Sequence, residues 1–81
     1  MILDANDRIN LKKINDLKEK MKEKLGEIKF KTWIEYPLSH YKIEENILYL
    51  EFQNEFSKII FEERYLNLIK ENIDIEVRFL R

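Results

Sequence analysis

Apolar residues recur every three to four positions through residues 8–25, which is the spacing of one face of an α-helix. They form a single stripe made of Leu11, Ile14, Leu17, Met21 and Leu25. Gly26 follows the stripe where a helix C-terminal cap would lie, so we expect the helix to end there. Residues 27–34 repeat the helical spacing in a second, shorter helix, which ends before Pro37.

The pattern changes to strict alternation in two later segments, as expected of half-buried β-strands. Residues 41–53 predict a hairpin that turns at residues 44–46, and residues 73–79 predict a third strand. Between them, Asn54 is a good N-cap for a third helix that runs to about Asn72. The apolar stripe expected on this helix consists of Ile59, Phe61, Tyr65, Leu66, Leu68 and Ile69.

The expected order of elements is helix, helix, strand, strand, helix, strand. One three-stranded sheet covered on one face by helices is the simplest way to bury all of these apolar faces. We therefore predict an α+β fold. A chain of 81 residues has room for only one core, so residues 1–81 are expected to form one domain.

Composition narrows the classes of function. The chain has no cysteine, which excludes a disulfide framework, a thiolate zinc site and a cysteine nucleophile. No apolar run spans a membrane and no signal-peptide pattern opens the chain, so we expect a cytoplasmic protein. The net charge of −1 argues against dedicated nucleic-acid binding. The charge is uneven, since residues 12–31 carry eight lysines against four acidic residues, and residues 35–81 carry six basic against ten acidic residues.

Few groups in this chain are suited to catalysis. His40 is the only histidine, and it lies in a polar loop without a nucleophile or acidic partner at a known spacing. The acidic pairs Glu44 with Glu45 and Glu62 with Glu63 are adjacent in sequence, so their side chains diverge. A single glycine cannot form a phosphate-binding loop. We expect no enzyme activity, no cofactor and no metal site.

Two features of the helices allow more than one interpretation. Lys13, Lys20 and Lys24 flank one edge of the first apolar stripe. Such lysines commonly keep their ammonium groups in water, but they could also contact single-stranded nucleic acid weakly or dock an acidic partner. Trp33 is either a core anchor paired with Phe30 or a platform on which a base stacks.

Phe56 and Ile60 lie one turn apart on the third helix, to one side of its main stripe and among Glu63, Asn67 and Glu71. Either the helix is buried on two sides near its start, or Phe56 belongs to an exposed apolar patch. A large apolar residue at a rim of charge is typical of a protein contact.

Several short motifs resemble, in order and spacing, the N-terminal domain (domain I) of the bacterial replication initiator DnaA. The matching pieces are Phe30-Lys31-Thr32-Trp33-Ile34, Pro37-Leu38, Leu48-Tyr49-Leu50, Asn54-Glu55-Phe56 and Arg64-Tyr65. The resemblance extends from about Leu11 to Phe79. It implies a KH-like α+β fold and a non-catalytic module that self-associates, contacts the replicative helicase, docks regulators of initiation and binds single-stranded DNA only weakly.

The resemblance also implies roles for individual residues. The helicase-contact phenylalanine of the family's N-x-F motif falls on Phe56, and we expect Asn54, Ile60 and Lys29 to share its partner site. Lys29 stands where some members use an acidic residue for the helicase contact. Ile14 lies about where an exposed tryptophan mediates self-association in some members.

The chain departs from the family pattern in three places. Tyr36 is an extra residue between Ile34 and Pro37, Gln53 replaces the usual proline before Asn54, and no G-x-x-G loop is present for KH-type RNA clamping. The first hypothesis is an interaction module of replication initiation that acts through the second and third helices, either stand-alone or as part of an initiator. The alternatives are a small single-stranded nucleic-acid-binding protein that uses the basic first helix, and a decoy or adaptor of a full-length initiator.

Overall fold

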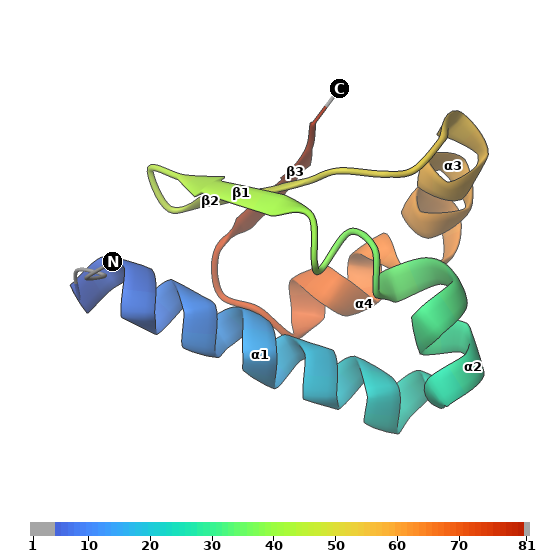
Figure 1. Ribbon diagram of the computed structural model, residues 1–81, viewed down its shortest axis with the longest axis horizontal. Coiled ribbons are helices and arrows are strands. Elements are labelled where there is room, and N and C mark those ends of the chain that lie inside the picture. Colours follow the sequence, from blue (N-terminus) through green and yellow to red (C-terminus); the bar gives the residue numbers. More distant parts are fainter. Residues whose placement is uncertain (1–4, 81) are drawn as a thin grey trace.

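The computed structural model describes residues 5–80 and has the predicted α+β architecture (Figure 1). The elements in chain order are α1 (Ala5–Leu25), α2 (Glu27–Lys29), the π-helical segment η1 (Phe30–Ile34), β1 (Tyr41–Glu44), β2 (Ile47–Leu50), α3 (Glu55–Arg64), α4 (Leu66–Glu71) and β3 (Glu76–Phe79). The helices lie on one side of the three-stranded sheet. The expected domain also includes residues 1–4 and 81, which lie outside the described residues.

The first helix begins three residues earlier than predicted and ends where predicted. α1 runs from Ala5 to Leu25, and the Gly26 N–H then donates to the Lys22 carbonyl at 2.9 Å. Gly26 has a positive φ of 86°, a conformation that glycine adopts without the steric cost that other residues pay. The glycine therefore ends α1 and lets the chain turn directly into α2.

Two apolar residues that were expected to be buried are exposed. Leu11 and Ile59 are each 44% exposed. Leu11 lies at the edge of the α1 stripe, where part of its side chain is exposed to solvent. Ile59 precedes Phe61 by two residues, and such residues lie about 200° apart on a helix. Because Phe61 is fully buried, Ile59 is turned away from the core.

The second helix spans residues 27–34, as predicted, but its winding changes on the way. α2 is α-helical, and from Phe30 onward the backbone widens into the π-helix η1. The Glu35 N–H donates to the Phe30 carbonyl at 2.8 Å, five residues back rather than four. Phe30 and Ile34 are buried, and Trp33 is half-buried against the same core. This packing favours the core-anchor interpretation of Trp33.

The predicted hairpin forms with a tight turn. β1 and β2 are antiparallel, and their last pair joins Glu44 to Ile47, which leaves Glu45 and Asn46 as the turn. Both turn residues have positive φ values, 50° and 64°, as a type I′ hairpin turn requires. The turn is one residue shorter than the three expected from the sequence.

The third strand joins the sheet beside β2, in parallel, so that the strand order is β1-β2-β3. A parallel pair needs a crossover, and α3 with α4 supplies it. β3 covers only Glu76–Phe79 and is shorter than the predicted 73–79, because Ile73 and Asp74 belong to the connection from α4. Ile75 and Val77 are buried, as their alternation predicts.

The predicted third helix is divided into two. Asn54 caps α3 as predicted, with its side-chain Oδ1 accepting a hydrogen bond from the Ser57 N–H at 2.8 Å. The backbone leaves helical geometry at Tyr65 (φ −121°, ψ −17°), after which α4 follows. Phe61, Tyr65 and Ile69 are all buried, so both helices keep one side on the core across the break.

One hydrophobic core joins α1, η1, β2, α3, α4 and β3. In β2, Leu48 and Leu50 face this core, whereas Ile47 and Tyr49 are half-buried on the uncovered face of the sheet. No helix among residues 5–80 has both the length and the apolar character needed to cross a membrane.

Candidate functional site

Phe56 is an exposed aromatic side chain at a fixed helix start. It lies in the first turn of α3, two residues after the Asn54 cap, and 64% of it is exposed. Its ring contacts the ring of Trp33 from η1, with the centroids 6.2 Å apart and the planes tilted by 58°. Of the two alternatives for this end of the helix, exposure is the one that the structure shows for Phe56.

The other two α3 residues expected at the partner site are placed differently. Ile60, one turn after Phe56, is half-buried and packs against the core. Asn54 is exposed, but its side-chain oxygen is occupied by the cap hydrogen bond to Ser57. Asn54 therefore fixes the helix start that carries Phe56, and Ile60 belongs to the packing of α3 on the core.

Lys29 is the last residue of α2 and lies on the same side of the helix as Trp33. It is exposed and precedes Trp33 by four residues, which places the two side chains about one helical turn apart. The neighbouring Lys31 pairs with Glu27 at 3.6 Å, whereas Lys29 forms no ion pair within the described part of the chain. We call Lys29, Trp33, Phe56 and Ile59 the α2–α3 surface.

Two exposed apolar residues near this region escaped the sequence-based prediction. Ile28 is 82% exposed in α2, and Ile59 is 44% exposed in α3. A signal for each was present in the sequence. Ile28 precedes the buried Phe30 by two residues, just as Ile59 precedes Phe61, and this spacing places both on the outer side of their helices.

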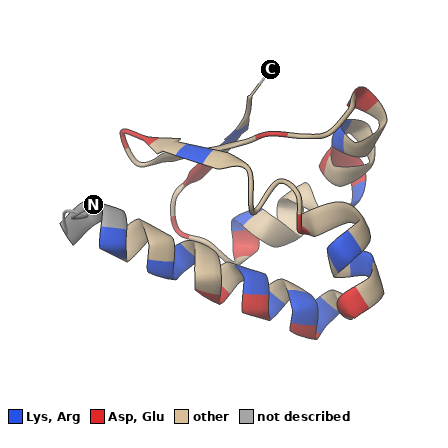
Figure 2. Cartoon of the chain, in the orientation of Figure 1, with Lys and Arg blue, Asp and Glu red and all other residues tan. Residues whose placement is uncertain are grey.

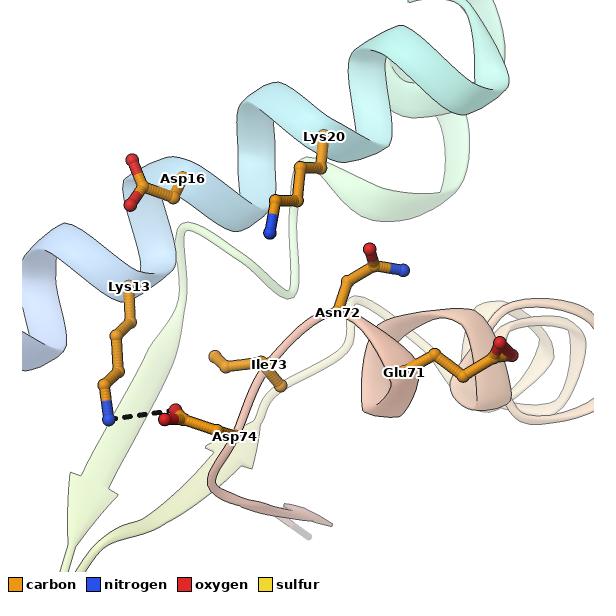
Figure 3. Close-up of a pocket in the computed structure, with 7 residues that line it drawn as sticks. All are labelled: Lys13, Asp16, Lys20, Glu71, Asn72, Ile73 and Asp74. Atoms are coloured by element: carbon orange, nitrogen blue, oxygen red, sulfur yellow. Dashed lines mark ion pairs between the residues drawn. The ribbon is translucent and has the colours of Figure 1, made fainter.

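The lysines expected to contact nucleic acid line two adjoining hollows between α1 and the connection from α4 to β3. Lys13 and Lys20 line the first (Figure 3), and Lys20 and Lys24 line the second. The acidic residues of the same hollows are Asp16, Glu23, Glu71 and Asp74. The two hollows are lined by four carboxylates and three ammonium groups, so this groove does not favour a phosphate backbone.

One of these lysines is already paired. Lys13 Nζ lies 2.9 Å from Asp74 Oδ1, and the hydrogen bond and charge of Lys13 lower the pKa of Asp74. The pair ties α1 to the segment that enters β3 (Figure 3). Through this ion pair, Lys13 takes part in holding the fold together.

Ile14 has no exposed surface. The α1 stripe turns it inward beside Leu17, where a second copy of the chain cannot reach it. The expectation that Ile14 takes part in self-association is therefore corrected, because Ile14 belongs to the core.

His40 is engaged with its own loop. Its ring stacks on Tyr36 at a centroid distance of 4.0 Å, and its Nδ1 lies 3.1 Å from the Tyr36 carbonyl oxygen. Within the described part of the chain, no three His, Asp or Glu side chains come together as a metal site would need. The α2–α3 surface is the candidate site that carries exposed apolar groups.

The family model of the DnaA N-terminal domain matches residues 14–74. This range includes every residue of the α2–α3 surface, together with most of α1, the hairpin and both helices of the crossover. No curated protein sequence and no solved structure matches the chain.

Proposed function

Because the chain belongs to the DnaA N-terminal domain family, which acts in replication initiation, we propose that it is a non-catalytic protein-interaction module whose binding site is the α2–α3 surface. One observation carries the proposal. Phe56, on which the resemblance places the family's helicase-contact phenylalanine, is 64% exposed on a capped helix start. We propose that the module works in the cytoplasm.

The geometry around Phe56 suits a binding hot spot. Aromatic side chains that a partner can cover completely carry a large share of binding energy. The Asn54 cap and the ring of Trp33 hold Phe56 in place before a partner arrives, so little conformational freedom is lost on binding. Loss of Phe56 should weaken binding much more than folding, because it removes little core volume.

The proposed partner is the replicative helicase or a regulator of initiation. It would bury an apolar group against Phe56 and bring a carboxylate toward Lys29. An adaptor that engages a full-length initiator could use the same surface. The mixed charge of the groove lined by Lys13, Lys20 and Lys24 does not support the alternative of a single-strand nucleic-acid-binding protein.

The test is a calorimetric titration of the chain with the purified replicative helicase of the same organism. We expect Phe56→Ala to melt within a few degrees of the parent and to lose at least tenfold in affinity, as for a hot-spot residue. Lys29→Glu should weaken binding in a salt-dependent way. Ile9→Ala is the matched control, because Ile9 is also an exposed apolar residue but lies on α1.

Two results would contradict the proposal. If Phe56→Ala folds and binds the helicase like the parent, the partner uses another face. If Phe56→Ala unfolds the domain, Phe56 belongs to the core and the assigned site is wrong.

A further inference from the structure

Glutamates border the exposed apolar residues of α3. Glu55 precedes Ile59 by four residues, and Glu62 and Glu63 follow it by three and four, so all three are its helical neighbours. All three are exposed, and none forms an ion pair within the described part of the chain. Phe56 and Ile59 are therefore bordered by acidic residues, and bands of acidic residues are visible on α3 in Figure 2.

Among residues 5–80, the basic residues of α3 form no ion pair with these glutamates. Lys58 is half-buried, and its Nζ lies over the ring of Phe79 at 5.7 Å from the centroid, on the side toward β3. Arg64 lies in the last turn, at the far end of the helix from Phe56. The unpaired negative charge is thus concentrated around Ile59.

The opposite border of the α2–α3 surface has the opposite charge. Lys29 lies one turn from Trp33, and Trp33 contacts Phe56, so the cation stands on the α2 side of the apolar strip. A partner that lies along this strip meets negative charge on its α3 side and positive charge on its α2 side. Complementary charge on two borders selects both the partner and its orientation.

We propose that the α2–α3 surface binds an amphipathic helix whose apolar stripe is bordered by lysine or arginine on the side that faces α3. This inference rests on the proposed function and names the chemistry of its partner. An amphipathic helix fits because two adjacent helices offer an apolar strip between polar borders. The glutamates repel the phosphates of nucleic acid, so the occupant is a protein segment.

The experiment uses two synthetic helices of about 20 residues, a length at which an isolated helix can form. Both carry the same leucine stripe and contain no tryptophan or tyrosine. One has lysine at the border positions and the other has glutamate. Trp33 is the only tryptophan of the chain and contacts Phe56, so its fluorescence reports binding at this surface.

We expect the lysine-bordered helix to change the Trp33 emission and to bind at least tenfold more tightly than the glutamate-bordered helix. The double variant Glu62→Gln, Glu63→Gln should weaken the lysine-bordered helix by about two- to fivefold per charge, the range of an exposed ion pair. Glu19→Gln, Glu23→Gln is the matched control, because both residues are exposed on α1 and the net charge changes equally. This control should bind like the parent, and Phe56→Ala should not bind detectably.

Three results would overturn the inference: equal or tighter binding of the glutamate-bordered helix, unchanged binding by the Glu62 and Glu63 variant, or equal weakening by the α1 control. These results are distinct from a failure of the proposed function. If the helicase requires Phe56 but the charge variants have no effect, only the inferred border chemistry is wrong. If the lysine-bordered helix behaves as expected but the helicase does not bind, the surface chemistry stands and the proposed partner is wrong.

Discussion

Replacing Asn54 by Ala removes a single hydrogen bond that fixes both the start of α3 and the position of Phe56. The Asn54 side chain accepts from the Ser57 N–H at 2.8 Å, and both residues are at the surface. Loss of a side-chain N-cap costs about 1 kcal/mol, within a range of about 0.5–2. Each kcal/mol lowers the Tm of a domain of this size by roughly 4–8 °C. We therefore expect Asn54→Ala to fold and to melt several degrees below the parent.

The site should be affected more than the stability. Phe56 belongs to the first turn of α3, and that turn frays when its cap is lost, so the contact between Phe56 and Trp33 should loosen. The assay combines a circular dichroism melt with Trp33 fluorescence and helicase affinity on the same samples. Asn54→Asp should restore all three, because a carboxylate accepts the same hydrogen bond and suits a helix N-terminus.

Asn67→Ala, at an exposed position of α4, is the control and should leave all three measurements unchanged. The capping argument fails if Asn54→Ala melts like the parent. It also fails if Asn54→Asp does not recover the melting temperature.

Three further results are expected. Ile14→Ala should lower the free energy of unfolding by about 2–5 kcal/mol, as for other large-to-small core substitutions. Urea unfolding measures this free energy, and a decrease of less than about 1 kcal/mol would contradict the burial of Ile14. Asp74→Asn should lower the Tm at neutral pH, because Lys13 depresses the pKa of Asp74 in the folded state. The stabilisation is present above the unfolded pKa and is lost as the pH falls through the folded pKa, so the Tm difference between variant and parent should vanish in acid. A Tm difference that persists at low pH would have another origin. Sedimentation should show a monomer or weak dimer, since Ile14 is inaccessible; a tight dimer at micromolar concentration would contradict this.

Local signals in the sequence were sufficient to place the elements in order, but not to place all of their ends. Gly26 ends α1 and Asn54 begins α3 because each acts through its own backbone or its nearest neighbours. The break at Tyr65 has no such signal, since no proline or glycine lies near it. It follows from how α3 and α4 both pack on one core, and this depends on elements distant in sequence.

The residues of the candidate site could also be predicted only in part from the sequence. The helical pattern left two alternatives for Phe56, burial on a second side of the helix or exposure in an apolar patch, and the structure shows that it is exposed. The role of Lys13, Lys20 and Lys24 could not be assigned from the sequence, for a different reason. Of the acidic residues near them, Glu71 ends α4 and Asp74 lies in the connection to β3. Both are more than 40 residues away in sequence, and a helical wheel of α1 cannot include them.

The π-helical turn at Phe30–Ile34 sets the direction in which the chain leaves the second helix. One residue inserted into an α-helix rotates everything after it by about 100°. A π turn takes up one residue within the helix and spares the rest of the chain that rotation. Phe30 and Ile34 can thus stay on the core while Pro37 and Leu38 still arrive at buried positions. The wider turn thus changes the register of the helix directly beside the α2–α3 surface, and the chain leaves it through the buried Leu38 before the hairpin begins.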